Sequence, residues 1–243
     1  MQIIQILFGI FYLLNTFNSM DETQQSQPQQ SLFVPKCTDF ELTGKGDNEQ
    51  WDNTEWIQLA ILDESENIYE SKFKMLYSEM GIYVLGSFED NIISTEYTED
   101  QGDIWNGDVF EVFLQTDPSN PLYFEYEINP LNAELAILVP NNEGDFFGWS
   151  PWHYEGPRKI KKAVQVYGGK GESGATISSW RAELFFPYAL FKAMKNVPPK
   201  SGTEWQGNFY RMDYDSGNHR KWSWAPVESS FHEYKKYWPI IFK

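Results

Sequence analysis

Residues 72–88 read KFKMLYSEMGIYVLGSF, and this stretch decides the fold. In its first half the apolar side chains of Phe73, Met75 and Tyr77 recur at every second position, which places them on one face of an extended chain. A short turn with a Gly, residues 78–81, separates this half from a second apolar run. Two such runs joined by a Gly-containing turn predict a β-hairpin.

Short apolar and aromatic runs predict strands through most of the remaining chain. They are residues 109–114, 123–128, 134–139, 163–167, 180–186, 205–213, 221–224 and 238–242, with Gly, Pro, Asn and Asp clusters between them. The pattern of one helix follows Pro187, where YALFKAM occupies residues 188–194. We therefore expect an all-β fold, an antiparallel β-sandwich with one short helix.

The first residues differ from the rest in composition. Residues 1–19 contain an apolar run of about a dozen residues, shorter than the roughly 20 that cross a bilayer, which is typical of a signal peptide. Residues 20–31 are Gln-rich and predict a disordered linker. The domain is then residues 32–243, and the protein is expected to be secreted. The alternative is that the apolar run is a buried helix or strand.

Charge and composition restrict the partners. The net charge of −16 argues against a nucleic-acid partner and against binding to an anionic membrane, and favours a neutral ligand or a cation. The 10 Trp residues exceed what a core of this size needs, so some are expected to line a surface or a cleft. Cys37 is the single cysteine, which excludes an intramolecular disulfide. We expect a monomer.

Several sequence segments, in this order and spacing, indicate a family. They are FVPK (33–36), KFKMLYSEMGIYVLGSFED (72–90), IWNGDVFEVFL (104–114), YFEYEINPLN (123–132), SSWRAELFFPYALF (178–191), WQGNFYRMD (205–213) and WSWAPVESSFHEYKKYWPIIF (222–242). Over residues 33–242 the chain resembles the family 9 carbohydrate-binding modules and the family 9-like proteins, whose sandwich is of the DOMON type. The resemblance implies a domain that binds a gluco- or xylo-type saccharide and is not an enzyme.

The resemblance also implies a site. In the family a sugar lies between two aromatic rings, which correspond here to Trp105 and Phe231, and Glu111 corresponds to a carboxylate that binds sugar hydroxyls. Glu127 and Asn129 lie two positions apart on one face of a neighbouring strand, where they add hydrogen bonds. The predicted carbohydrate site is therefore Trp105, Glu111, Glu127, Asn129, Phe231 and His232.

The closing segment departs from the family pattern. The family has a His, one residue, a Pro and then an aromatic–Gly pair, whereas here His232 is followed by Tyr234 and by Tyr237-Trp238. This difference leaves the shape of the last loop, and with it the ligand preference, open.

Other polar residues have structural explanations. Asp90 and Asp108 resemble acidic turn residues that cap a turn or, in this family, help hold a structural calcium. Calcium takes six to eight oxygen ligands, and the sequence does not assemble such a set. Apart from this structural calcium, no cofactor is expected. Trp222 and Trp224 are expected in the core, and Arg211 is expected to form a buried ion pair.

Three alternatives to a sugar-binding module remain open. A glycoside hydrolase needs two carboxylates across a cleft, and the sequence singles out no such pair and no catalytic motif. A haem-binding DOMON-type electron-transfer domain needs axial ligands, for which Met75, Met80, Met212 and His232 are available. A third alternative is an interaction protein whose site no longer binds sugar.

Overall fold

The hairpin predicted at residues 72–88 is formed by β4 (Ser71–Tyr77) and β5 (Gly81–Glu89), which pair antiparallel with Met75 opposite Val84. The computed structural model describes residues 30–62, 69–143, 145–146, 148–152, 155–215, 217 and 219–243. The predicted signal peptide and residues 20–29 of the linker lie outside the described residues.

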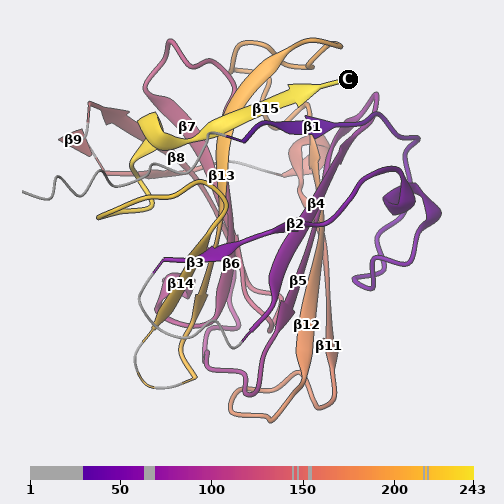
Figure 1. Ribbon diagram of the computed structural model, residues 1–243, viewed down its shortest axis with the longest axis vertical. Coiled ribbons are helices and arrows are strands. Elements are labelled where there is room, and N and C mark those ends of the chain that lie inside the picture. The colour runs from indigo at the N-terminus through magenta and orange to yellow at the C-terminus, as the bar shows by residue number, and fades with distance from the viewer. Residues whose placement is uncertain are drawn as a thin grey trace, which may run out of the picture.

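Two sheets pack face to face, as Figure 1 shows. The large sheet has the order β1 (Leu32–Val34), β15 (Trp238–Phe242), β13 (Glu204–Asp213), β6 (Val109–Gln115), β7 (Leu122–Ile128), β8 (Glu134–Asn142) and β10 (Ser150–Pro151). Off this path, β14 (Arg220–Ser223) pairs with both β13 and β3 (Ala60–Ile61), and β9 (Asp145–Phe146) pairs with β8. The small sheet has the order β11 (Lys161–Tyr167), β12 (Ser179–Pro187), β5, β4 and β2 (Ile57–Gln58). The all-β sandwich is confirmed, and within the described strands only the β1–β15 pair is parallel.

Helical structure in the described residues consists of short 3-10 turns: η1 (Glu49–Asn53), η2 (Ile104–Asn106), η3 (Gly156–Arg158) and η4 (Tyr234–Lys236). The segment after Pro187, expected to be a short helix, instead forms consecutive turns in which each hydrogen bond spans three residues. The reason is competition for the backbone, because the Leu190 carbonyl accepts the indole N–H of Trp152 at 2.9 Å. No helix in the described part of the chain is long and apolar enough to cross a membrane.

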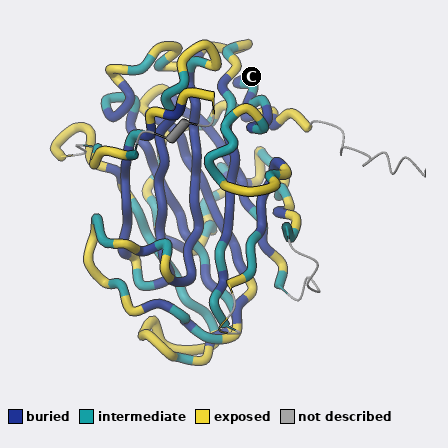
Figure 2. The backbone as a smooth tube through the Cα atoms, turned by 90° about the vertical axis from the view of Figure 1, so that its left-hand side faces the viewer, coloured by how far each residue is buried: buried dark blue, intermediate teal, exposed yellow. Residues whose placement is uncertain are grey.

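The main core lies between the sheets. Phe73, Met75 and Tyr77 all point into it, as the alternation predicts, and the Phe73 ring stacks on Phe209 of the large sheet at 3.8 Å. Trp222 and Trp224 are also in this core, as expected. Figure 2 shows that the central strands are buried along their length while the loops at both ends are exposed.

Arg211 is a fully buried charge at one edge of this core. Its guanidinium donates to Asp213 Oδ2 at 2.8 Å, to Asp90 Oδ2 at 3.2 Å and to Ser71 Oγ at 2.9 Å. The Trp222 ring covers the guanidinium at 4.9 Å. The predicted buried ion pair is confirmed.

Replacement of this cation should destabilise the fold. Arg211→Met leaves Asp90 and Asp213 buried without their cation, and we expect the free energy of unfolding in urea at neutral pH to fall by about 3–5 kcal/mol. The control is Arg181→Met, which removes a partly exposed Arg of the small sheet and should cost under about 1 kcal/mol. Equal losses in both variants would contradict this role of the buried cation.

Candidate functional site

A second apolar layer covers the outer face of the large sheet, the face turned away from the small sheet. Strand alternation sends every second residue of β6, β7 and β8 to this face, where Val109, Phe113, Tyr123 and Leu135 form a buried cluster under two covering loops. A cavity of about 360 Å³ opens between these loops. Its lining residues are Trp105, Glu111, Glu125, Glu127, Leu135, Ile137, Trp149, Met212, Lys221, Ser229, Ser230, Phe231 and His232.

One wall of the cavity carries Trp105, on η2. The fully buried Ile104 anchors this turn, and the hydroxyl of Tyr214 donates to the Trp105 carbonyl at 2.9 Å. Gly107 follows the turn, and a Cβ there would lie 2.6 Å from Thr95, so the glycine permits close packing. The Trp105 ring is half-buried, with Trp149 edge-on at 6.4 Å.

Another part of the lining is the loop before η4. Phe231 stacks one ring face on Tyr210 at 4.0 Å, and the Phe231 carbonyl accepts the hydroxyls of Tyr210 and Tyr237 at 2.8 and 3.0 Å. Backbone N–H groups of the loop donate to Glu233. Burial raises the pKa of the Glu233 carboxyl, but hydrogen bonds from Lys236 and from the loop outweigh this effect and lower the pKa to about 2. The Glu233 side chain, which holds the loop, therefore stays charged. The loop departs from the family pattern yet is held firmly.

His232 follows on the same wall. Its Nδ1 lies 2.7 Å from the Tyr123 hydroxyl and 3.7 Å from Glu125 Oε2. Burial lowers the pKa of His232 to about 4, so the imidazole is neutral at physiological pH.

The floor of the cavity is acidic. Glu111 of β6 lies directly opposite Glu127 of β7, and Glu125 points to the same face two residues earlier. Each is 4% exposed or less, and ligand atoms of the three carboxylates lie within 4.8 Å of one another. We call Glu111, Glu125 and Glu127 the acidic floor.

Burial and mutual repulsion change the protonation of the acidic floor. Burial first, and then the neighbouring carboxylate, raises the pKa of Glu111, Glu125 and Glu127 well above the ordinary value. Glu125 and Glu127 lie close enough for each carboxyl group to shift the pKa of the other. The floor therefore holds protons at a pH at which isolated carboxyl groups are ionised.

The structure brings five of the six predicted site residues together, since Trp105, Glu111, Glu127, Phe231 and His232 all line the cavity. Asn129 does not line it. The Asn129 amide donates to the Tyr97 carbonyl at 2.7 Å and its side-chain oxygen accepts the backbone N–H groups of Leu131 and Ala133, so it shapes the turn after β7.

Some lining residues were not predicted. The period of two that placed Glu127 outward also places Glu125 there, and this signal was available in YFEYEI. Trp149 and Lys221 had no comparable signal, because they reach the cavity from a loop and from the short strand β14.

Comparisons with known proteins agree with this architecture. Residues 42–142 match the family described as carbohydrate family 9 binding domain-like. The resemblance to family 9 is confirmed. No curated protein matches the chain.

Solved structures share the fold of this chain. A candidate carbohydrate-binding protein from Bacteroides uniformis ATCC 8492 has a TM-score of 0.74 at 18% identity, covering 88% of this chain and all (100%) of that one. A family 9 module from Caldicellulosiruptor kristjanssonii, solved with cellotriose, has a TM-score of 0.62 at 16% identity, covering 88% of this chain and 94% of that one. A family 9 module from Caldicellulosiruptor kristjanssonii solved with glucose has a TM-score of 0.61 at 15% identity, covering 88% of this chain and 96% of that one.

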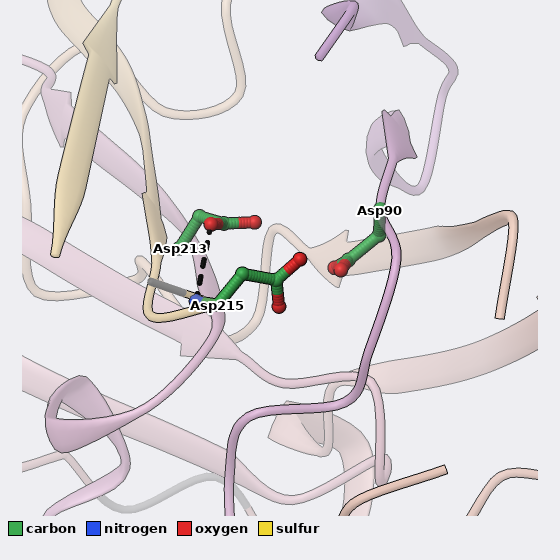
Figure 3. Close-up of side chains that lie close together, drawn as sticks. All are labelled: Asp90, Asp213 and Asp215. Atoms are coloured by element: carbon green, nitrogen blue, oxygen red, sulfur yellow. Dashed lines mark hydrogen bonds between the residues drawn. The ribbon is translucent and has the colours of Figure 1, made fainter. Parts of the chain in front are cut away.

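A second acidic group, which we call the aspartate cluster, consists of Asp90, Asp213 and Asp215. Figure 3 shows Asp90, from the end of β5, facing Asp213 and Asp215 across a short gap. Asp90 accepts the Trp180 indole N–H and Arg211, and Asp215 accepts the hydroxyls of Tyr69 and Ser94. The carboxyl groups of the cluster therefore accept hydrogen bonds from surrounding side chains of the fold.

Asp108, the other candidate calcium ligand, is not among the residues of this cluster. Its two oxygens accept the backbone N–H groups of Ser94 and Tyr214, which is the turn-capping arrangement. Burial raises the pKa of Asp108 to about 8, and burial likewise raises the pKa of Asp90 to about 7 despite the adjacent Arg211.

These raised values predict how stability depends on pH. A carboxyl whose pKa is higher in the folded than in the unfolded state binds more protons when folded, so its stabilisation is complete below about pH 4 and is lost as pH rises through the folded value. For Asp90 and Asp108 those folded values are about 7 and 8. We expect the free energy of unfolding in urea to be lower at about pH 8 than at about pH 5.5 by roughly 2 kcal/mol or more.

Glu111→Gln provides a second test, because burial also raises the pKa of Glu111 and the amide cannot ionise, so this variant should lose less stability over the same interval. A stability that is flat or rises over this interval would show that the buried carboxyls are not protonated in the folded state.

Proposed function

We propose that this protein is a non-catalytic carbohydrate-binding protein whose ligand, a gluco- or xylo-type saccharide, occupies the cavity on the outer face of the large sheet. The observation that carries the proposal is the position of Trp105, Phe231, Glu111 and Glu127 around one cavity. The match to family 9 and the modules solved with cellotriose and glucose support it.

The chemistry of the cavity suits a sugar. A pyranose has an apolar C–H face and a rim of hydroxyls, so it needs a flat ring for the face and hydrogen-bonding groups for the rim. The exposed sides of the Trp105 and Phe231 rings serve the first purpose and the acidic floor serves the second. Carboxyl groups that are protonated donate to hydroxyls, and those that are ionised accept from them.

The volume fits a small ligand. Small-molecule sites occupy roughly 300–1,000 Å³, and this cavity of about 360 Å³ lies near the lower end. A disaccharide has about 23 heavy atoms, which at roughly −0.3 kcal/mol each gives about −7 kcal/mol and a Kd of about 10 μM.

Removal of the half-buried indole should weaken this binding. We expect Trp105→Ala to cost about 2 kcal/mol or more in affinity for gluco- or xylo-oligosaccharides, measured by isothermal titration calorimetry. Trp56→Ala is the control, because Trp56 packs on the cluster beneath the outer face of the small sheet. That variant should leave affinity unchanged, and an unaltered Kd in Trp105→Ala would remove the indole from the site.

The arrangement of the acidic floor argues against hydrolysis. In a glycosidase the two carboxyl groups flank the scissile bond, about 5 Å apart or more. Here the carboxylates come from two adjacent strands of one sheet and lie on the same side of the cavity. Incubation of purified protein with xylan or cellulose should therefore release no reducing sugar, and release that disappears in Glu127→Gln would establish an enzyme instead.

We propose further that the protein is exported and acts as a monomer. Residues 1–19 have the composition of a signal peptide and residues 20–31 that of a tether. N-terminal sequencing of the mature protein from the growth medium and its mass by light scattering test both points.

A further inference from the structure

The acidic floor contains more acceptor capacity than the fold uses. Glu125 Oε2 and Glu127 Oε2 are buried and accept no hydrogen bond from the described residues, and the nearest ring nitrogen, His232 Nδ1, is 3.7 Å from Glu125. Unsatisfied carboxylate oxygens in a buried position are costly. Both side chains line the cavity.

The aspartate cluster provides the internal comparison. There, every oxygen of Asp90, Asp213 and Asp215 accepts a hydrogen bond, and Arg211 supplies the cation from within the fold. Among the described residues that line the cavity, Lys221 is the single lysine, and although its charge opposes the rise in the pKa of Glu111, it forms no ion pair within 4 Å with the floor. One cluster carries its counter-ion and the other is open toward the cavity.

The number of donors and acceptors identifies the missing group. A primary ammonium has three N–H donors and no acceptor, and the floor presents three carboxyl groups whose ligand atoms lie within 4.8 Å of one another. Acceptors about 2.8 Å from one nitrogen in tetrahedral directions are separated by about 4.6 Å. We infer that the cavity binds an amino sugar, with the sugar's ammonium group on Glu111, Glu125 and Glu127. This inference rests on the proposed function and specifies its ligand.

The walls favour an ammonium ion over a metal ion. Calcium takes six to eight oxygens, whereas the lining around the floor adds the hydroxyls of Ser229 and Ser230 and otherwise consists of rings, apolar side chains, the cation of Lys221 and the neutral imidazole of His232. Aromatic rings attract ammonium ions through their π faces. The protein already holds one ammonium in this way, since Lys221 Nζ lies 5.8 Å from the centre of the Phe231 ring.

Three sugars that share one β-1,4-linked backbone test the inference. Titration calorimetry in buffer with a metal chelator, at about pH 6 where the sugar amine is protonated, compares the trimer of glucosamine with cellotriose and with the trimer of N-acetylglucosamine. We expect the glucosamine trimer to bind at least about tenfold more tightly than either neutral trimer, because each bond to a charged group is stronger than a neutral one.

Variants separate the contributions of charge and ring. Glu125→Gln and Glu127→Gln should bring the glucosamine and glucose trimers to within about threefold of each other, since the amide still hydrogen-bonds neutral hydroxyls but lacks the charge that favours the ammonium. Trp105→Ala should weaken both trimers alike. Glu41→Gln removes a charge that is 90% exposed, far from the floor, and should keep the preference. Urea unfolding of each variant verifies that it folds.

The outcomes are distinct. If cellotriose binds as tightly as the glucosamine trimer, or if the preference survives both Glu→Gln variants, the ammonium site is wrong while sugar binding stands. If cellotriose binds only after calcium is added, the floor is a metal site and the inference fails. If neither neutral nor amino sugars bind the wild-type protein, the proposed function itself fails.

Discussion

The central strands of the large sheet are covered on both faces, and the cavity depends on this double burial. On the inner face Phe110 and Val112 of β6 contact the core shared with the small sheet. On the outer face Val109 and Phe113 lie beneath the loops that carry Trp105 and Phe231. Because hydrophobic burial on both faces stabilises β6 and β7, the sheet tolerates carboxyl groups that are costly to desolvate.

Double burial also explains why the strands were easy to predict and their ends were not. Strands β4, β6 and β13 are long and apolar or alternating, so their periodicity stands out. By contrast β2, β3, β9 and β10 are two residues each, too short to show a period. The segment after Pro187 has a helical composition, yet the Leu190 carbonyl bonds to Trp152, a partner that lies 38 residues away in sequence. Local propensity does not report such contacts.

The site shows the same division between local and distant information. The outward direction of Glu111 and Glu127 follows from alternation within each strand. That these two residues lie directly opposite each other follows from the register of β6 on β7, which the sequence does not state. The period of two extends to Glu125, but its proximity to Glu111 depends on the same register. Asn129 shares the strand period as well, yet β7 ends at Ile128 and the turn uses its side chain.

The two acidic groups show how one sheet arrangement serves both stability and binding. Arg211 of β13 points inward, where its guanidinium donates to the buried carboxyl groups of Asp90 and Asp213. One residue earlier, Tyr210 points outward and supports Phe231 beside the cavity. The alternation of a single strand therefore sends a cation to the inner acidic cluster and an aromatic support to the outer one. Within the described residues no Lys or Arg forms an ion pair with the acidic floor, and a charged ligand that combines a flat apolar face with N–H donors complements both the rings and the carboxyl groups of the cavity.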